Sequence, residues 1–203
     1  MTRRRLSNQA RKAFRVALDV DESRGAPCIF ASRHGDLRRT LELINALVAD
    51  ESISPTQFSL SVHNAISGQY SIFTGNQADC NAIAAGADSL QYAVLEAAAR
   101  LVSEPDLEEV LVVYSDDQVP EVYQPYCQEP SALSAIALLL SNHEGERVRF
   151  SRQTIEPEHA GFEKINAENT VSDQLVDLIS FLNGAHDQYR RISQGQSWEW
   201  SRG

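Results

Sequence analysis

The sequence predicts an α/β fold with a mixed central sheet and helices on both of its faces. Apolar residues at helical spacing alternate along the chain with short apolar runs that are typical of strands. The run 110–114, VLVVY, is apolar throughout and flanked by acids, which indicates a strand buried on both faces. The strand-like segments 134–141 and 147–153 are joined by NHEGE, a hairpin signal that predicts an antiparallel pair.

The first part of the chain reads as helix, strand and helix. Residues 7–18 carry apolar side chains at helical spacing after Ser7, a plausible cap, and 28–32 is a short apolar run between Pro27 and a glycine. The second helix, from about 36 to 49, is expected to bury a stripe of apolar side chains. The members of this stripe are Leu37, Leu41, Ile44, Leu47 and Val48.

The remaining elements follow the same alternation. A stretch typical of loop and helix leads to a segment of alternating polarity at 78–84. A long Ala-rich helix is expected at 89–102. After the apolar strand and the hairpin pair, 155–170 is polar and irregular, and a last helix is expected at 171–182. Trp198 and Trp200 are spaced by one residue. This spacing favours a final strand that packs both rings inward, rather than a cage that holds a ligand.

Composition and charge limit the possible functions. The 203 residues, 42% of them hydrophobic, suit a single domain over 1–203. A formal net charge of −10 argues against nucleic acid or insertion into an anionic membrane. Residues 1–39 nevertheless hold ten Lys or Arg against four acids. This basic region is interpreted either as the solvated side of the first helix or as a docking patch for an acidic partner.

Cysteine and histidine usage indicates neither a disulfide framework nor a metal centre. The three cysteines, Cys28, Cys80 and Cys127, are widely spaced and no secretory signal precedes them, so we expect a reducing cytoplasm. The five histidines form no pair with ligand spacing. The longest apolar runs are too short to cross a bilayer. We therefore expect a cytoplasmic protein without metal or cofactor.

The stretch 54–90 is the part of the sequence most suggestive of a site. A strand that runs through a small-residue turn into a helix commonly presents a nucleophile or binds an anion. The turn here, 84–89, reads AAGADS and contains no thiol. Cys80 lies earlier, where we expect a buried structural side chain with a raised pKa. Asp88 is interpreted as a cap at the start of the helix.

Histidines near this stretch leave a catalytic alternative open. His63 could act as a base for Ser61 or Ser67, although no G-x-S-x-G elbow is present. His34 lies in a strand-to-helix loop of the kind that lines sites in open α/β sheets, or it is a structural or solvated residue.

The segment VHNAISGQYSI, followed by a glycine, is similar to a conserved stretch of the β-ketoacyl synthases. Asn64, Gly68, Ser71, Ile72 and Gly75 stand at the matching spacings. The sequence also resembles the short, chain-length-factor-like members of the β-ketoacyl synthase N-terminal-like family, which accompany aryl polyene synthesis. The matching sequence motifs are RRRLS, FASRHG, SPTQFSLSVHNA, AAGADS and WEW.

The resemblance implies a thiolase-like half fold in which Ala87 occupies the position of the ketosynthase nucleophile. A ketosynthase needs a thiolate and donors from a C-terminal half that has no counterpart in this sequence. The resemblance therefore implies a non-catalytic accessory protein that pairs with a ketosynthase or an acyl carrier protein, or with a second copy of itself. The alternative is an acyl transferase or thioesterase that uses His34 or His63. The candidate site-lining residues are His34, His63, Asn64, Gly68, Ala87 and Asp88.

Overall fold

The computed structural model describes residues 6–127, 134–155 and 174–203. Its contacts divide the chain into two compact units, Met1–His143 and Glu144–Gly203, and each is described by itself. The expectation of one domain over 1–203 stays a prediction.

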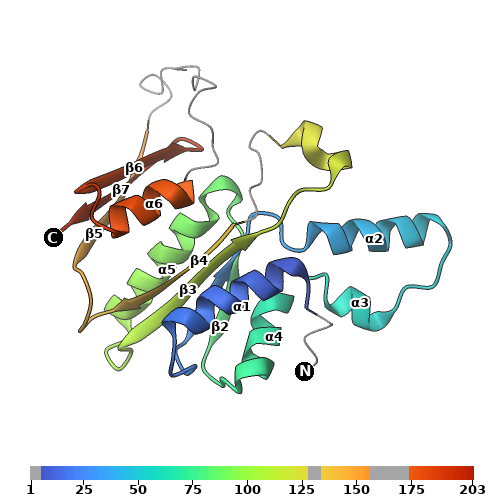
Figure 1. Cartoon of the computed structure of the whole chain (residues 1–203), viewed down its shortest axis with the longest axis horizontal. Coiled ribbons are helices and arrows are strands. Elements are labelled where there is room, and N and C mark those ends of the chain that lie inside the picture. Colours follow the sequence, from blue (N-terminus) through green and yellow to red (C-terminus); the bar gives the residue numbers. More distant parts are fainter. Residues whose placement is uncertain (1–5, 128–133, 156–173) are drawn as a thin grey trace. The chain divides into compact units, whose positions relative to one another are not determined.

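The first unit is an α/β layer structure, and Figure 1 shows its elements in chain order. Its helices are α1 (Asn8–Val20), α2 (Leu37–Val48), α3 (Pro55–Ser59), α4 (Ala65–Thr74) and α5 (Ser89–Ser103), with short 3-10 turns η2 (Gly86–Asp88) and η3 (Glu121–Tyr126). Its strands are β1 (Cys28–Ala31), β2 (Cys80–Ile83), β3 (Glu109–Asp116) and β4 (Ser134–Ser141).

These four strands form a mixed sheet in the order β2-β1-β3-β4. β1 pairs in parallel with β2 and β3, whereas β4 is antiparallel to β3. The strands that are interior to the sheet, β1 and β3, are buried along almost their whole length, as expected for strands covered on both faces. The predicted mixed sheet is therefore confirmed.

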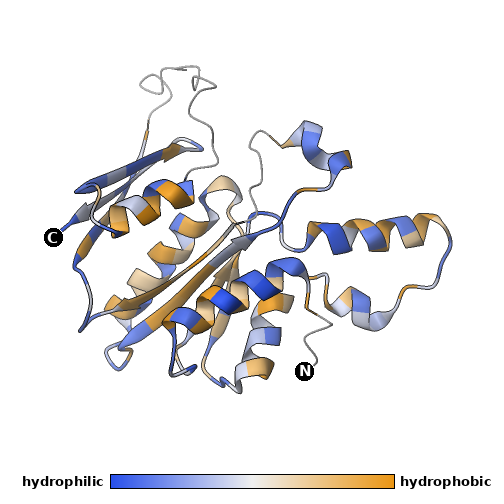
Figure 2. Cartoon of the chain, in the orientation of Figure 1, coloured by the Kyte–Doolittle hydropathy of each residue, from blue (hydrophilic) through white to orange (hydrophobic). Residues whose placement is uncertain are grey.

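Helices cover both faces of this sheet (Figure 1). α1 and α4 pack on the face that carries Cys28 and Phe30, where Phe14 of α1 meets Tyr70 of α4 edge to face. α5 packs on the other face, because its small residues allow a close approach to β1 and β3. Ser7 caps α1 with its side chain as predicted. Figure 2 shows apolar strands between these amphipathic helices.

The helices α2 and α3 form an arm that projects beyond the sheet (Figure 1), and we call residues 36–62 the arm. The helix predicted near 36–49 is confirmed, but its predicted burial is wrong. None of its residues is buried, and Leu47 and Val48 are 66% and 82% exposed. The reason is that α1, α4 and α5 already occupy the two faces of the sheet, so α2 contacts α3 instead.

The second unit is a three-stranded antiparallel sheet with one helix. The strands β5 (Val148–Thr154), β7 (Gln196–Arg202) and β6 (Gln188–Ser193) lie in that order, and α6 (Gln174–Leu182) packs beside them. Trp198 is 0% exposed and Trp200 is 5% exposed, which confirms the predicted strand with inward-facing rings. The irregular segment expected at 155–170 lies almost entirely outside the described residues, as do the first residues of the expected last helix.

The predicted hairpin between 134–141 and 147–153 is wrong. β4 pairs with β3 along eight residues, and β5 pairs instead with β7. Two interactions explain this outcome. Asn142, in the supposed hairpin turn, is bound to the first unit through the carbonyls of Glu108 and Leu101, and Phe150 of β5 stacks on Trp198 of β7.

Candidate functional site at the carboxyl ends of the parallel strands

Ser32, directly after β1, is the centre of the candidate site. The carboxyl ends of parallel strands meet at one edge of a sheet, where open α/β folds place their sites. The Ser32 carbonyl accepts a hydrogen bond from His63 Nε2 at 3.1 Å, and Ser89 Oγ lies 3.4 Å from the same oxygen. The loop after β1, the turn before α4 and the start of α5 therefore converge on one backbone group.

A buried polar network lies beneath this carbonyl. The Ser32 hydroxyl donates to Asp116 Oδ1 at 2.8 Å and accepts from Gln9 Nε2 at 2.9 Å. Asp116 also accepts from the Tyr114 hydroxyl and from the backbone N–H of Arg33. Asp116 is only 6% exposed, so its carboxylate depends on these donors to offset the cost of burial. The network fixes the end of β3 to the loop after β1.

Gly35 lets this loop approach the turn before α4. Its φ of +62° is a left-handed conformation, and an added Cβ would lie 3.4 Å from His63 Cδ2. Its N–H donates to the Ser32 hydroxyl at 2.8 Å. Gly35 and His63 therefore bring the two ends of the arm together.

The turn that precedes α5 contains Ala87, the residue expected from the sequence at the nucleophile position of a ketosynthase-like elbow. Ala87 lies in η2 and is buried, at 8% exposure. Ser89 Oγ accepts from the Ala85 N–H and donates to the Gly86 carbonyl, so its hydroxyl stabilises the turn. Asp88 stands at the N-cap position of α5, where a carboxylate interacts favourably with the helix dipole, as predicted. Its side chain makes no capping hydrogen bond, so that part of the prediction is wrong.

The two candidate histidines, His34 and His63, are both half-buried. A carbonyl oxygen can only accept, so His63 donates from Nε2 to Ser32 and that nitrogen has no lone pair free to act as a base. The hydroxyls of Ser61 and Ser67 donate to the backbone carbonyls of Phe58 and Asn64. Burial, reinforced by the charge of a neighbouring arginine, lowers the pKa of His34, which favours its neutral form.

The other two candidates lie on α4. Asn64 is the exposed N-cap residue of that helix and makes no side-chain capping bond. Gly68 is exposed, and an added Cβ there would meet nothing within 4 Å. His63 and Ser89 thus meet at the Ser32 carbonyl, next to the turn that holds Ala87 and Asp88. Asn64 and Gly68 face solvent on α4.

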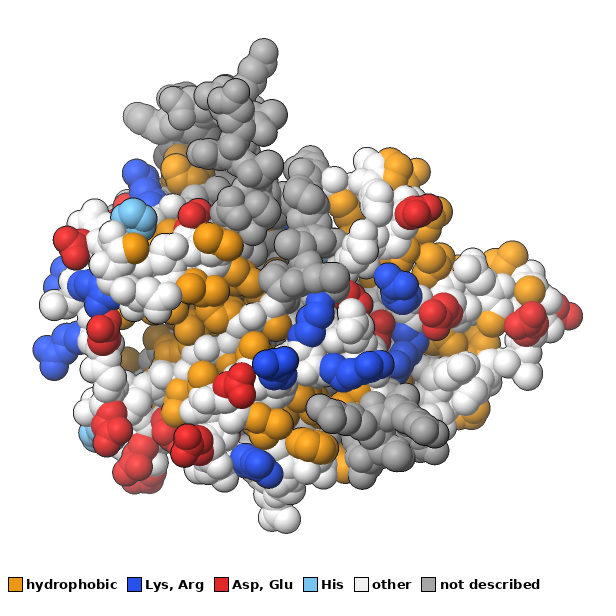
Figure 3. All heavy atoms as spheres, viewed as in Figure 1, with side chains coloured by type: hydrophobic (Ala, Val, Ile, Leu, Met, Phe, Trp, Pro, Cys, Tyr) orange, Lys and Arg blue, Asp and Glu red, His pale blue; other side chains and the backbone are white. Residues whose placement is uncertain are grey.

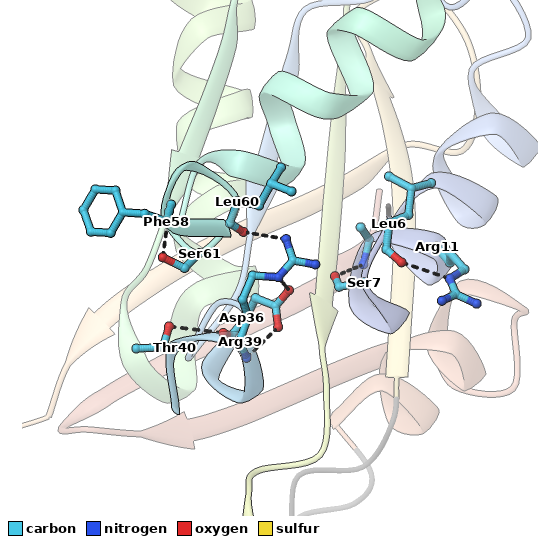
Figure 4. Close-up of polar contacts among 10 residues, drawn as sticks. Leu6, Ser7, Arg11, Asp36, Arg39, Thr40, Phe58, Leu60 and Ser61 are labelled. Atoms are coloured by element: carbon cyan, nitrogen blue, oxygen red, sulfur yellow. Dashed lines mark hydrogen bonds and ion pairs between the residues drawn. The ribbon is translucent and has the colours of Figure 1, made fainter. Parts of the chain in front are cut away.

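A polar cleft of about 450 Å³ opens at the same edge of the sheet. It is lined by Ser7, Asn8, Arg11, Asp36, Arg38, Arg39, Glu42 and Asp117. Figure 4 shows Arg39 paired with Asp36 and donating to the Leu60 carbonyl, so this arginine fixes α2 to the segment after α3. Figure 3 shows Lys and Arg side chains gathered over α1 and the start of α2.

Sequence reasoning missed this cleft and the Ser32 network. The only signals were the loop 32–35 after a strand and the basic first helix, because Asp116 and Asp117 are distant from both in sequence and Gln9 is distant from the loop. The basic residues 3–5 lie outside the described residues. Lys12 pairs with Asp117 at 4.0 Å, whereas Arg11 and Arg15 are exposed.

Cys80 differs from its predicted environment. It is half-buried beside the cluster of α1 and α4, and its interaction with the Cys28 thiol lowers its pKa, whereas the sequence predicts a raised one. The reverse holds for Cys28, whose pKa is raised by its interaction with Cys80 and by burial.

Neither a metal centre nor a membrane span is found in the part of the chain that the structure describes. No group of three or more His, Cys, Asp or Glu side chains there could hold a metal ion. Among the same residues, no helix has both the length and the apolar character needed to span a bilayer.

The mixed sheet lies between helices, and at the carboxyl ends of its parallel strands β2 leads through a tight turn into α5. This arrangement defines a thiolase-like fold of the ketosynthase class. The model of the family described as beta-ketoacyl synthase, N-terminal domain, matches residues 1–201, and the chain belongs to this family. No protein of curated function matches it.

Solved structures share this fold, and among them are the following two. The first is a ketosynthase, ApeO, in complex with its chain length factor, ApeC, from Xenorhabdus doucetiae, with 27% identity and a TM-score of 0.78 over 98% of this chain and 79% of the matched chain. The second is the ishigamide ketosynthase/chain length factor, with 12% identity and a TM-score of 0.60 over 75% of this chain and 50% of the matched chain. The chain is thus a ketosynthase-like relative of proteins found in ketosynthase and chain length factor complexes.

Proposed function

We propose that this chain is a non-catalytic, cytoplasmic accessory protein of the chain-length-factor type, which associates with a ketosynthase in polyketide or fatty-acid-type synthesis such as that of aryl polyenes. The observation that carries the proposal is the buried methyl of Ala87 at the elbow. A methyl group cannot hold an acyl chain as a thioester, so the condensation reaction cannot begin there. The likeness to a structure that pairs a ketosynthase with its chain length factor supports the choice of partner.

The surface around β2 and α4 is suited to association. β2 is an edge strand of the described sheet, and its outer backbone groups are available for pairing with another chain. α4 contacts β2 and carries Ile72 and Phe73, which are 74% and 46% exposed. Exposed apolar side chains beside an unpaired strand edge are typical of an interface. We assign ketosynthase pairing to this surface, with a second copy of the chain as the competing occupant.

The polar cleft is the second surface in the proposal. Its three arginines, Arg11, Arg38 and Arg39, border an opening at the edge of the sheet that holds the elbow. The cleft also contains three acids, Asp36, Glu42 and Asp117, so its arginines and acids are equal in number. An acyl carrier protein would therefore meet a polar cleft of mixed charge while the ketosynthase performs the chemistry.

The alternative is an acyl transferase or thioesterase based on His34 or His63. The hydroxyls near His63 donate to backbone carbonyls, and its Nε2 donates to Ser32, so no nucleophile and base are paired there. This geometry favours the accessory role.

The test is co-expression with a ketosynthase of the ApeO type, followed by co-purification. We expect a stable complex. Burial of the exposed part of Ile72 is worth about 1–2 kcal/mol, so Ile72→Glu should weaken the complex at least roughly tenfold. Val102→Glu is the matched control, because Val102 is 85% exposed and belongs to α5 rather than to β2 or α4.

A second arm examines the purified chain with acyl-CoA and acyl carrier substrates. Intact mass should reveal no covalent acyl adduct, and no free thiol product should accumulate. Turnover that His63→Ala or His34→Ala abolishes would defeat the accessory role. Equal loss of the complex with Ile72→Glu and Val102→Glu would defeat the assigned surface.

A further inference from the structure

Two cysteines that are far apart in sequence lie opposite each other in the sheet. Cys28 of β1 and Cys80 of β2 are register partners in the parallel pair. Opposite positions on adjacent strands are about 4.8 Å apart, inside the Cα separation of about 4.4–6.8 Å that a disulfide spans. Both side chains point toward the face covered by α1 and α4. The backbone therefore already holds the pair at bonding distance.

The two thiols interact and are unequal in character. The two thiols are close enough to interact, and the Ser67 hydroxyl of α4 lies near Cys80. The interaction with the Cys28 thiol lowers the pKa of Cys80, while the same interaction and burial raise the pKa of Cys28. Thiolate is the reactive form of cysteine, so Cys80 is the one that attacks an electrophile and Cys28 is the one that keeps its proton.

The thiol with the lowered pKa, Cys80, is also the more exposed of the two. Cys80 is half-buried at the first position of the edge strand, where a small oxidant can reach it. Cys28 is 1% exposed on an interior strand, and its sulfur is accessible only to a neighbour such as Cys80. An accessible thiol of low pKa next to a shielded resolving thiol is the arrangement of an oxidant-sensitive pair.

We propose that Cys28 and Cys80 are a modification site, a dithiol that a hydroperoxide oxidises to an intramolecular disulfide. Cys80 sulfur attacks the peroxide, the O–O bond breaks, and sulfenic acid and one molecule of water or alcohol form. Cys28 sulfur then attacks the Cys80 sulfur, the S–O bond breaks, and the oxygen leaves as water with the Cys28 proton. Two thiols lose two electrons in total, and the peroxide gains them. The proposal does not depend on the function assigned above.

The experiment uses the whole chain and hydrogen peroxide. After oxidation and excess peroxide removal, remaining thiols are alkylated and the protein is digested without reduction. We expect a peptide pair linked through Cys28 and Cys80, an intact mass lower by two hydrogens, and Cys127 still alkylated. Cys127→Ser is the matched control and should oxidise as the wild type does, because Cys127 lies in the η3 segment rather than in the sheet.

Single variants separate the two roles. Cys28→Ala removes the resolving thiol, so Cys80 should persist as a sulfenic acid that dimedone labels. Cys80→Ser should abolish the loss of thiols altogether, since Cys28 is shielded. The wild-type peptide map decides the question even where a variant fails to fold. Three alkylatable thiols after oxidation, a disulfide that includes Cys127, or dimedone labelling of Cys28 before Cys80 would each overturn the proposal.

Discussion

Matched leucine-to-alanine substitutions test whether the apolar stripe of α2 is unpartnered in the isolated chain. Leu47 of α2 is 66% exposed, whereas Leu90 of α5 is 0% exposed. Complete burial of a leucine is worth about 1.5–3 kcal/mol, so the buried third of Leu47 contributes about 0.5–1 kcal/mol. Alanine recovers a few tenths of this through its higher helix propensity. We expect Leu47→Ala to lower the free energy of unfolding by about 0.5 kcal/mol, and Leu90→Ala to lower it by about 2–5 kcal/mol.

The measurement is urea denaturation followed by circular dichroism, with each variant compared at two protein concentrations. A cost for Leu47→Ala as large as that for Leu90→Ala, at both concentrations, would refute the reasoning, because Leu47 would then be buried within its own chain. A cost that appears only at the higher concentration would instead reveal self-association through α2.

Two further predictions concern the candidate site. Asp116→Ala should lower the free energy of unfolding by about 3 kcal/mol, because it leaves two buried hydroxyls and a backbone N–H without their acceptor. Urea denaturation measures this free energy. The control is Asp79→Ala, at a carboxylate that is 82% exposed, which should lower the free energy of unfolding by less than about 0.5 kcal/mol. Equal losses in the two variants would contradict the importance of the network. The pKa of His34 is lowered on folding, so the unfolded chain binds more protons and stability should fall as the pH drops below the ordinary value of 6.5. Unfolding midpoints from pH 7.5 to 5.5 check this, and a slope that is unchanged in His34→Asn would assign the effect to another group.

Local patterns in the sequence were sufficient to predict most elements of the first unit. Ser7 caps α1, the run 110–114 is buried on both faces, and the turn at 84–89 does lead into a long helix. Each of these features depends on neighbours along the chain, such as helical spacing or an apolar run between acids. The placement of Ala87 in the turn before α5 could be predicted for the same reason, because turn and helix belong to one continuous segment.

Features that depend on distant partners could not be predicted. The helical spacing of α2 is the same whether its apolar side meets a core or solvent, so Leu47 and Val48 were expected to be buried. The turn after β4 has hairpin composition, but the aromatic contacts of Phe150 with β7 decide the pairing. The Ser32 network joins Gln9 to Asp116, and no local pattern relates these two positions.

The arm closes on itself at its base, where Gly35 and His63 touch. An excursion that leaves and rejoins a scaffold at one point behaves like an insertion, because changes in its length do not alter the distance its ends must span. Residues can be added to or deleted from 36–62 without shifting β1 or α4. Relatives could therefore vary this segment freely and reshape what it meets while the sheet stays the same.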